Sequence, residues 1–309
     1  MSCWARCSRR GLSGESFGER AHAVTSSDVR RGAVGVAALV VFAALAGTTY
    51  QGVTTAVERR EFPRPGRMVD IGDYQLHIAC TGKGAPVVVL EAPAAGLSSA
   101  WGWVQPALAV HTRVCSYDRA GLGWSEAQEG DFDPGRAAED LRRLLEGAGE
   151  TGPYVVVGHG LGASLAQVFA GRFPGDVRGL ALVDAPSPDS GGPAALLVQY
   201  PALTPWLARV GILRAMGVAA DLTRGLPVPA AGALSSFLNR PDHLTRSARE
   251  LRKWDEAMAT AASALLPPGL AVERVATARP ARVSFLIHED EAAQVAAAVR
   301  RLIGTTKDR

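Results

Sequence analysis

Runs of aliphatic residues alternate with amphipathic stretches through the middle of the chain, over residues 67–188. The apolar run at 155–157 is typical of a strand buried on both faces, and residues 137–145 repeat apolar positions at the spacing of a surface helix. This alternation predicts the α/β class. Further strands are expected over residues 68–71, 74–80, 86–91, 112–117, 179–184, 270–275 and 281–287.

One stretch breaks the alternation sharply. After the apolar run, Gly158-His159-Gly160-Leu161-Gly162 forms a glycine-spaced corner, and an amphipathic segment follows over residues 165–173. Glycines at this spacing permit a tight change of direction, so the pattern predicts a buried strand, a sharp turn and a helix.

The first part of the chain has a different pattern. Residues 1–31 are rich in arginine and lack an apolar period, which predicts a disordered tail. Residues 33–53 carry no charge, and these 21 residues would form a helix of about 32 Å, close to the hydrocarbon thickness of a bilayer. We therefore expect one transmembrane helix over residues 32–53, with a cleavable signal peptide ending near 44–46 as the alternative. Residues 54–66, which contain Pro63 and Pro65, are expected to form an extended linker.

The order of these segments, with the glycine corner and the sequence DRAGLGWS at 118–125, resembles the α/β-hydrolase superfamily. The corner is similar to the nucleophile elbow G-x-S-x-G of that family. The resemblance implies a mostly parallel sheet flanked by helices, with the hydrolase core in residues 67–188 and a shortened C-terminal part in 267–309. Residues 189–266 would then form a helical cap, with helices expected over 203–216 and 242–258 and Asp242 as the N-cap of the second.

The same resemblance indicates that two catalytic side chains are missing. Gly160 stands where the family has its nucleophilic serine, and Phe285 stands where it has its catalytic histidine, while His288 matches a second, structural histidine. Asp184, at the end of an expected strand, is either the remaining catalytic acid or a turn cap. Because loss of the serine or the histidine of such a triad costs about 10⁶ in turnover, the family resemblance predicts an impaired or inactive hydrolase.

Part of the family's site needs no side chains. The oxyanion-binding amides would be those of Leu161 and of Ala94 or Ala95, and they remain available in this sequence. We therefore expect a small apolar or carbonyl ligand to bind in a capped pocket. The alternative is an active esterase-like hydrolase with a non-standard nucleophile, for which Ser164 is a candidate that lies one helical turn beyond the elbow.

The charge distribution and the motifs of the sequence limit the ligands that the chain is expected to bind. The net charge of +3 is spread along the chain, which predicts no nucleic-acid surface. No metal-binding or nucleotide-binding motif is present, so we expect no cofactor.

Cys80 and Cys115 lie on strands that are neighbours in the family's sheet, so they form either a disulfide or two buried thiols. A disulfide would place the domain in an extracytoplasmic compartment, anchored by its N-terminal helix. Protein partners cannot be inferred from the sequence.

Overall fold

The computed structural model describes residues 26–187, 203–278 and 286–307. The chain divides into two compact units, residues 1–44 and residues 45–309. Helix α1 (Ser26–Glu61) begins in the first unit and ends in the second. It is long and apolar enough to cross a membrane over Val29–Glu61.

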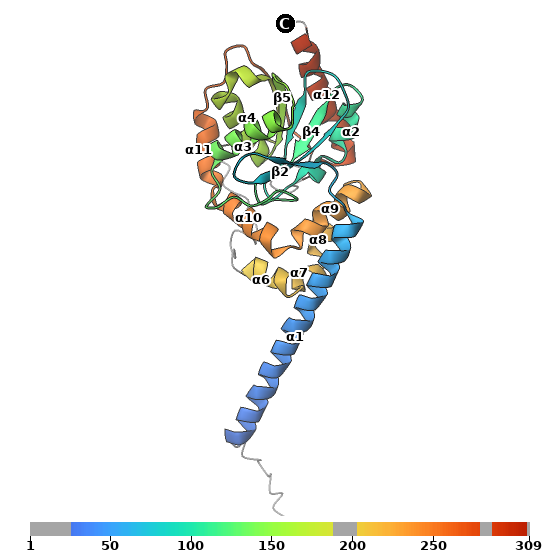
Figure 1. Ribbon diagram of the computed structural model, residues 1–309, viewed down its shortest axis with the longest axis vertical. Helices are drawn as coiled ribbons and strands as arrows, with labels where there is room; N and C mark the ends of the chain where they lie inside the picture. The colour runs from blue at the N-terminus through green and yellow to red at the C-terminus, as the bar shows by residue number, and fades with distance from the viewer. Residues whose placement is uncertain (1–25, 188–202, 279–285, 308–309) are drawn as a thin grey trace, which may run out of the picture. The chain divides into compact units, whose positions relative to one another are not determined.

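In the part of the chain that the structure describes, a seven-stranded sheet forms the centre of the second unit (Figure 1), in the order β1-β2-β4-β3-β5-β6-β7. Strands β1 and β2 pair antiparallel, as do β2 and β4, whereas all pairs from β4 to β7 are parallel. The α/β class and the mostly parallel sheet are thus confirmed. The strands are β1 (Arg67–Asp70), β2 (Gln75–Thr81), β3 (Val88–Glu91), β4 (Val114–Tyr117), β5 (Tyr154–His159), β6 (Val177–Val183) and β7 (Ala271–Val275).

Helices cover both faces of this sheet. Val155 and Val157 of β5 point to one face, where they pack with α2 (Val104–Ala109) and α12 (Glu289–Lys307). Val156 points to the other face and packs with α3 (Pro134–Gly147) and α4 (Leu161–Arg172). Because side chains alternate along a strand, the three consecutive valines of β5 contribute to the hydrophobic core on both faces of the sheet. Two short 3₁₀ helices are also described, η1 (Ser98–Trp101), which is mostly buried, and η2 (Pro174–Asp176), which has no buried residue.

Among the described residues, six helices lie between β6 and β7, in the segment expected to form a cap. They are α6 (Leu203–Arg209), α7 (Ile212–Ala215), α8 (Val218–Leu222), α9 (Val228–Leu238), α10 (Pro241–Arg252) and α11 (Trp254–Ser263). The single helix predicted over 203–216 is broken at Gly211, whose φ of 74° is left-handed. The helix predicted over 242–258 is also two helices, which meet at Lys253.

Two predicted boundaries were wrong. Asp242 does not cap α10, because Pro241 is the first helical residue and Arg240 is the N-cap; proline suits the first turn, where its missing N–H costs nothing. The linker predicted over 54–66 is helical as far as Glu61, since nothing before Pro63 interrupts the helix.

The strand predicted over 281–287 lies outside the described residues except for Leu286 and Ile287, which are buried but not in a strand.

Candidate active site

The glycine corner connects β5 to α4 with the geometry of a tight elbow. Gly160 has φ 56° and ψ −122° and directly precedes the first residue of α4. A Cβ atom on Gly158 would lie 2.2 Å from the carbonyl oxygen of Gly162, and one on Gly162 would lie 2.3 Å from that of Glu91. Glycines at 158 and 162 are therefore required for the helix to pack this closely on the strands.

Gly160 occupies the tip of this elbow. Its positive φ is a conformation that glycine adopts freely and that costs a side-chain-bearing residue about 1–3 kcal/mol. A glycine has no group that can attack a carbonyl carbon, so the position contributes backbone geometry and no nucleophile.

Two backbone amides border the elbow. Leu161 is the first residue of α4, so its N–H has no acceptor within the helix. The amide of Ala95, in the loop after β3, instead donates to Oε2 of Glu250 at 2.9 Å. Ala95 also has a positive φ of 57°. The amide of Ala95 is therefore already hydrogen-bonded to a carboxylate of α10 in this conformation. The amides of Ala94 and Leu161 remain as candidates for binding an oxyanion.

His159 and Asp184 lie next to the elbow. Nε2 of His159 is 3.6 Å from Oδ2 of Asp184, too far for a hydrogen bond. Asp184 accepts hydrogen bonds from the amide of Thr277 at 2.8 Å and from its hydroxyl at 2.6 Å. Burial tends to raise the pKa of Asp184, but the interactions with His159 and Thr277 outweigh it and hold the pKa below its usual value. Asp184 thus ties the ends of β6 and β7 together, as a cap would.

The other predicted site residues do not complete a triad. Ser164 is buried in α4, and its Oγ contacts Sδ of Met258 at 3.4 Å. Phe285 lies outside the described residues. His288 lies beside the backbone of Gly225, and its amide donates to Oε2 of Glu291 at 3.1 Å. Among the described residues, no hydroxyl or thiol is placed at the tip of the elbow with an imidazole beside it.

A buried ion-pair network lies under the loop after β3. The guanidinium of Arg119 donates to Glu91 at 2.6 Å and to Glu250 at 2.6 Å, and it also donates to the carbonyl oxygens of Ala92 and Pro93. The hydroxyl of Tyr117 donates to Glu91. Burial raises the pKa of Glu91, although Arg119 and Tyr117 oppose this shift. The network joins the core to the cap, because Glu250 is the only one of these residues on α10.

Sequence patterns do not predict Glu91 and Glu250 as partners of Arg119, which lies in the segment DRAGLGWS. Asp118 of that segment accepts from the amides of Ser98 at 2.6 Å and Trp124 at 2.9 Å, and it lies 3.0 Å from Nδ1 of His77. These contacts hold the turn after β4, so Asp118 has a structural role. Glu91 had a detectable signal, since an acidic residue at the end of a fully buried strand needs a charged partner.

His243 forms a second connection between α10 and the loop. Its Nε2 donates to the carbonyl oxygen of Ala95 at 3.1 Å, and its Nδ1 accepts from the amide of Gly123 at 3.2 Å. This pattern fits the neutral imidazole, because a protonated Nδ1 could not accept. Burial lowers the pKa of His243, and this exceeds the opposing effects of the Ala95 carbonyl and of nearby carboxylates.

We expect this histidine to make stability fall in mild acid. Below about pH 6.5 the unfolded chain binds a proton at residue 243 that the folded chain does not, so the free energy of unfolding falls by up to about 1.4 kcal/mol per pH unit. Chemical denaturation of wild type and His243→Gln at pH values from 7.5 to 5 measures the effect. The variant should show a shallower loss. Identical slopes would contradict the assignment.

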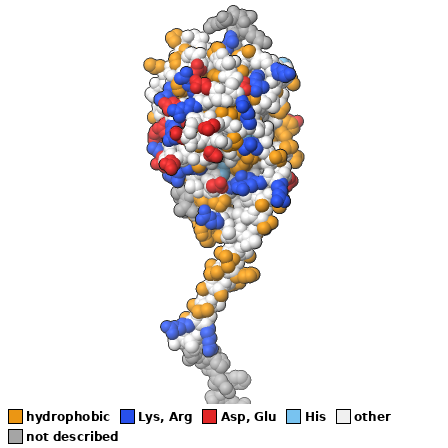
Figure 2. All heavy atoms as spheres, in the orientation of Figure 1, with side chains coloured by type: hydrophobic (Ala, Val, Ile, Leu, Met, Phe, Trp, Pro, Cys, Tyr) orange, Lys and Arg blue, Asp and Glu red, His pale blue; other side chains and the backbone are white. Residues whose placement is uncertain are grey.

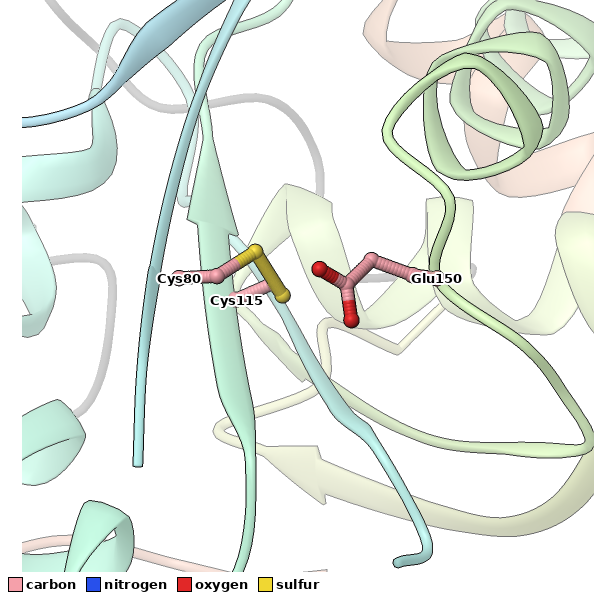
Figure 3. A group of neighbouring side chains, drawn as sticks. All are labelled: Cys80, Cys115 and Glu150. Atoms are coloured by element: carbon pink, nitrogen blue, oxygen red, sulfur yellow. A yellow bond between two sulfur atoms is a disulfide. The ribbon is translucent and has the colours of Figure 1, made fainter. Parts of the chain in front are cut away.

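Cys80 and Cys115 are joined by a disulfide that links β2 to β4 (Figure 3). The carboxylate of Glu150 lies beside the two sulfur atoms and is bound by Arg113 through two hydrogen bonds of 2.6 and 2.7 Å. Because disulfide sulfur is not a thiolate and the carboxylate is already paired, this group is not suited to hold a metal ion.

The structure also contains a cavity of about 730 Å³. Its wall includes Phe62, Pro65, Trp101 and Ala233, and no residue of the elbow lines it. Apolar residues of the cap and core pack directly on the elbow instead, including Leu161 and Leu165 from α4 and Leu244, Leu251 and Met258 from the cap. The surroundings of the elbow are therefore mostly apolar.

Residues 85–210 match the sequence profile described as alpha/beta hydrolase fold. The 2-hydroxy-6-oxo-2,4-heptadienoate hydrolase of Pseudomonas putida is 32% identical over 123 residues, which are 39% of this chain and 44% of that enzyme. An uncharacterised vacuolar membrane protein of Saccharomyces cerevisiae is 30% identical over 130 residues, which are 36% of this chain and 20% of that protein. This chain spans less than half of the length of the curated relatives that it matches.

Among solved structures, the enol-lactonase from Burkholderia xenovorans LB400 aligns with a TM-score of 0.59. The sequence identity is 18%, and the alignment covers 77% of this chain and 100% of the enzyme. At this level of identity the similarity establishes the fold and not the activity.

Proposed function

Because the chain has the α/β-hydrolase fold while glycine stands at the tip of its elbow, we propose that it binds a small apolar or carbonyl-bearing ligand without hydrolysing it. Gly160 carries this proposal. Acyl transfer by this fold needs a nucleophile at that point, and removal of such a residue costs about 10⁶ in turnover. The binding part of the site depends on backbone geometry, which a glycine leaves intact.

Retained backbone strain supports a binding role. Among the described residues, Ala95 and Asp184 are the two non-glycine residues with positive φ. Oδ2 of Asp184 is 3.6 Å from Nε2 of His159, and Ala95 follows Ala94, which packs in one apolar cluster with Leu161. Such positive-φ conformations cost on the order of 1–3 kcal/mol and persist only where the surroundings impose them. The amide of Leu161, at the N-terminus of α4, favours a carbonyl oxygen or an anion, and the apolar cap residues favour an apolar group beside it.

The alternative of an active hydrolase is supported by relatives that are named as hydrolases. It requires a nucleophile that can reach the elbow. Ser164 is directed at Met258 within a buried contact, which counts against it in this conformation.

We expect the amide of Leu161 to contribute to ligand affinity. Proline is tolerated at the first position of a helix and lacks the N–H, so Leu161→Pro deletes the donor, while Leu161→Ala truncates the side chain and keeps the donor. With p-nitrophenyl butyrate as probe, wild type should show ligand-induced stabilisation in a thermal-shift assay and no release of p-nitrophenol.

Loss of a hydrogen bond to a carbonyl oxygen should weaken binding about fivefold to tenfold in Leu161→Pro relative to Leu161→Ala. Equal affinities for the two variants would show that the amide of Leu161 does not contact the ligand. Release of p-nitrophenol by wild type would favour the active hydrolase.

We further propose that α1 anchors the protein in a membrane and that the hydrolase-like unit lies on the extracytoplasmic side. The apolar composition of α1 supports the anchor, as does the similarity to a vacuolar membrane protein. The disulfide between Cys80 and Cys115 supports the extracytoplasmic location of the hydrolase-like unit, because disulfides persist in oxidising compartments.

A further inference from the structure

We propose that the cap helices α6–α8 are embedded in the outer part of the bilayer that α1 crosses, with their exposed apolar side chains in contact with lipid. The inference rests on the proposed anchoring by α1 and adds a second membrane-contacting surface. The contacts and exposed side chains that support it lie within residues 45–309, which form one compact unit, and residues 31–44 enter only through the length of helix α1.

Exposed apolar side chains are concentrated on these helices. Outside α1, the described residues include nine large hydrophobic side chains that are exposed, and seven of them lie between Leu203 and Val228. A water-soluble surface carries such side chains singly, whereas a cluster marks an interaction site. The seven are Leu203, Trp206, Ile212, Met216, Val218, Leu222 and Val228; the other two, Val110 and Leu265, lie elsewhere.

The adjoining part of α1 has its polar and apolar faces inverted relative to a water-soluble helix. Gln51 is 6% exposed, and Glu58 is partly buried, so the polar side chains face the cap. Leu45, Val53 and Val57 are 54–64% exposed on the remaining surface. Burying polar groups while exposing apolar ones is favourable only where the outer medium is apolar. In Figure 2 hydrophobic side chains recur along the visible face of α1, interspersed with backbone atoms and other side chains.

Direct contacts attach the cap to this part of α1 (Figure 1). A Cβ atom on Gly47 would lie 2.2 Å from the carbonyl oxygen of Val210, so the two backbones touch at the junction of α6 and α7. Nε2 of Gln51 donates to the carbonyl oxygen of Asn239 at 2.6 Å. Arg214 forms an ion pair with Glu58 and donates to Oε1 of Gln51 at 2.9 Å. These contacts fix the level of α7 along the helix.

The length of the uncharged helix then sets the depth of the cap. Arg31 marks one boundary, because a charged residue is costly in hydrocarbon. The 16 residues from Arg31 to Gly47 rise only about 24 Å, less than the ~30 Å of a bilayer core, and helix tilt would reduce this height further. Gly47 and the α6–α7 junction beside it therefore lie about 6 Å or more inside the hydrocarbon boundary, which is the usual depth of an interfacial helix.

Exposed arginines lie on both sides of the hydrocarbon boundary that this depth defines. Arg59 and Arg60 follow the apolar part of α1, and Arg209 ends α6. Arginine can bury its aliphatic stem among acyl chains while its guanidinium reaches lipid phosphate. The surface thus combines apolar groups with mainly cationic ones, since the exposed carboxylate of α8, Asp221, is paired with Arg224, and this combination suits a phospholipid bilayer better than another protein.

Trp206 provides the test, because it is 54% exposed on α6. The full chain is reconstituted in phosphatidylcholine vesicles that contain 20% phosphatidylglycerol, with or without lipids brominated on the acyl chains. Bromine quenches indole fluorescence at short range, so the emission contributed by Trp206 should fall roughly twofold at interfacial depth. That contribution is obtained as the difference between wild type and Trp206→Phe. Trp101, which is 1% exposed in the core, serves as a matched control through Trp101→Phe and should show no quenching.

Carbonate extraction of the same vesicles separates the two proposals. Membrane retention with quenching of Trp206 supports both. Membrane retention without quenching overturns the embedded cap and leaves the anchor in place. Extraction of the chain into the supernatant overturns the anchor, and the embedded cap with it. A second variant, Met216→Glu, should reduce quenching of Trp206 by lifting the helices, whereas Val110→Glu, on the exposed end of α2, should not.

Discussion

Replacement of Arg119 by methionine is expected to lower the free energy of unfolding by about 3–5 kcal/mol. Arg119 is 5% exposed and bonds two buried carboxylates, Glu91 and Glu250, and two backbone carbonyl oxygens. Without the guanidinium, both carboxylates lose their cation in a medium of low polarity. Equilibrium denaturation in urea measures the loss.

Arg142 supplies a matched control, because it also pairs with two carboxylates, Glu146 and Asp176, but its side chain is 47% exposed. Arg142→Met should cost less than about 1 kcal/mol. The triple variant Arg119→Met, Glu91→Gln, Glu250→Gln should recover part of the loss, since it removes the unpaired charges. Similar losses for Arg119→Met and Arg142→Met would show that the buried network does not hold the cap to the core.

Restoring the nucleophile alone is expected to leave the protein inactive. Gly160→Ser should lower the free energy of unfolding by about 1–3 kcal/mol, because serine must adopt the positive φ that Gly160 has now. It should add little hydrolysis, since a serine without a proton acceptor is a weak nucleophile.

The double variant Gly160→Ser, Phe285→His is expected to hydrolyse p-nitrophenyl esters measurably above the rate of either single variant. The two changes act as a unit, so the gain should be strongly non-additive. Full activity of Gly160→Ser alone would show that the family's histidine position has been assigned to the wrong residue.

The sheet and the elbow could be predicted from sequence because their patterns are local. The valine run at 155–157 and the glycines at 158, 160 and 162 determine a buried strand and a close turn almost independently of the rest of the chain. The cap was predicted less well. Gly211 and Lys253 interrupt helices whose apolar period continues across the break, and periodicity alone gives no indication of such breaks.

The buried polar network could not be predicted, because its members lie far apart in the chain. Glu91, Arg119 and Glu250 come from β3, the loop after β4, and α10, and they meet only after the cap has packed. The occupation of the Ala95 amide by Glu250 has the same origin. The glycine at the tip of the elbow, by contrast, can be identified from the sequence, because the spacing of the neighbouring glycines determines which residue lies there.

Labelling of the intact, membrane-reconstituted chain with a fluorophosphonate probe tests the central claim most directly, because the probe reacts with any serine that a neighbouring base activates, whatever its substrate. The account predicts that wild type remains unlabelled and that Gly160→Ser, Phe285→His becomes labelled at residue 160. Labelling of wild type, mapped by mass spectrometry to Ser164 or to another serine, would contradict it.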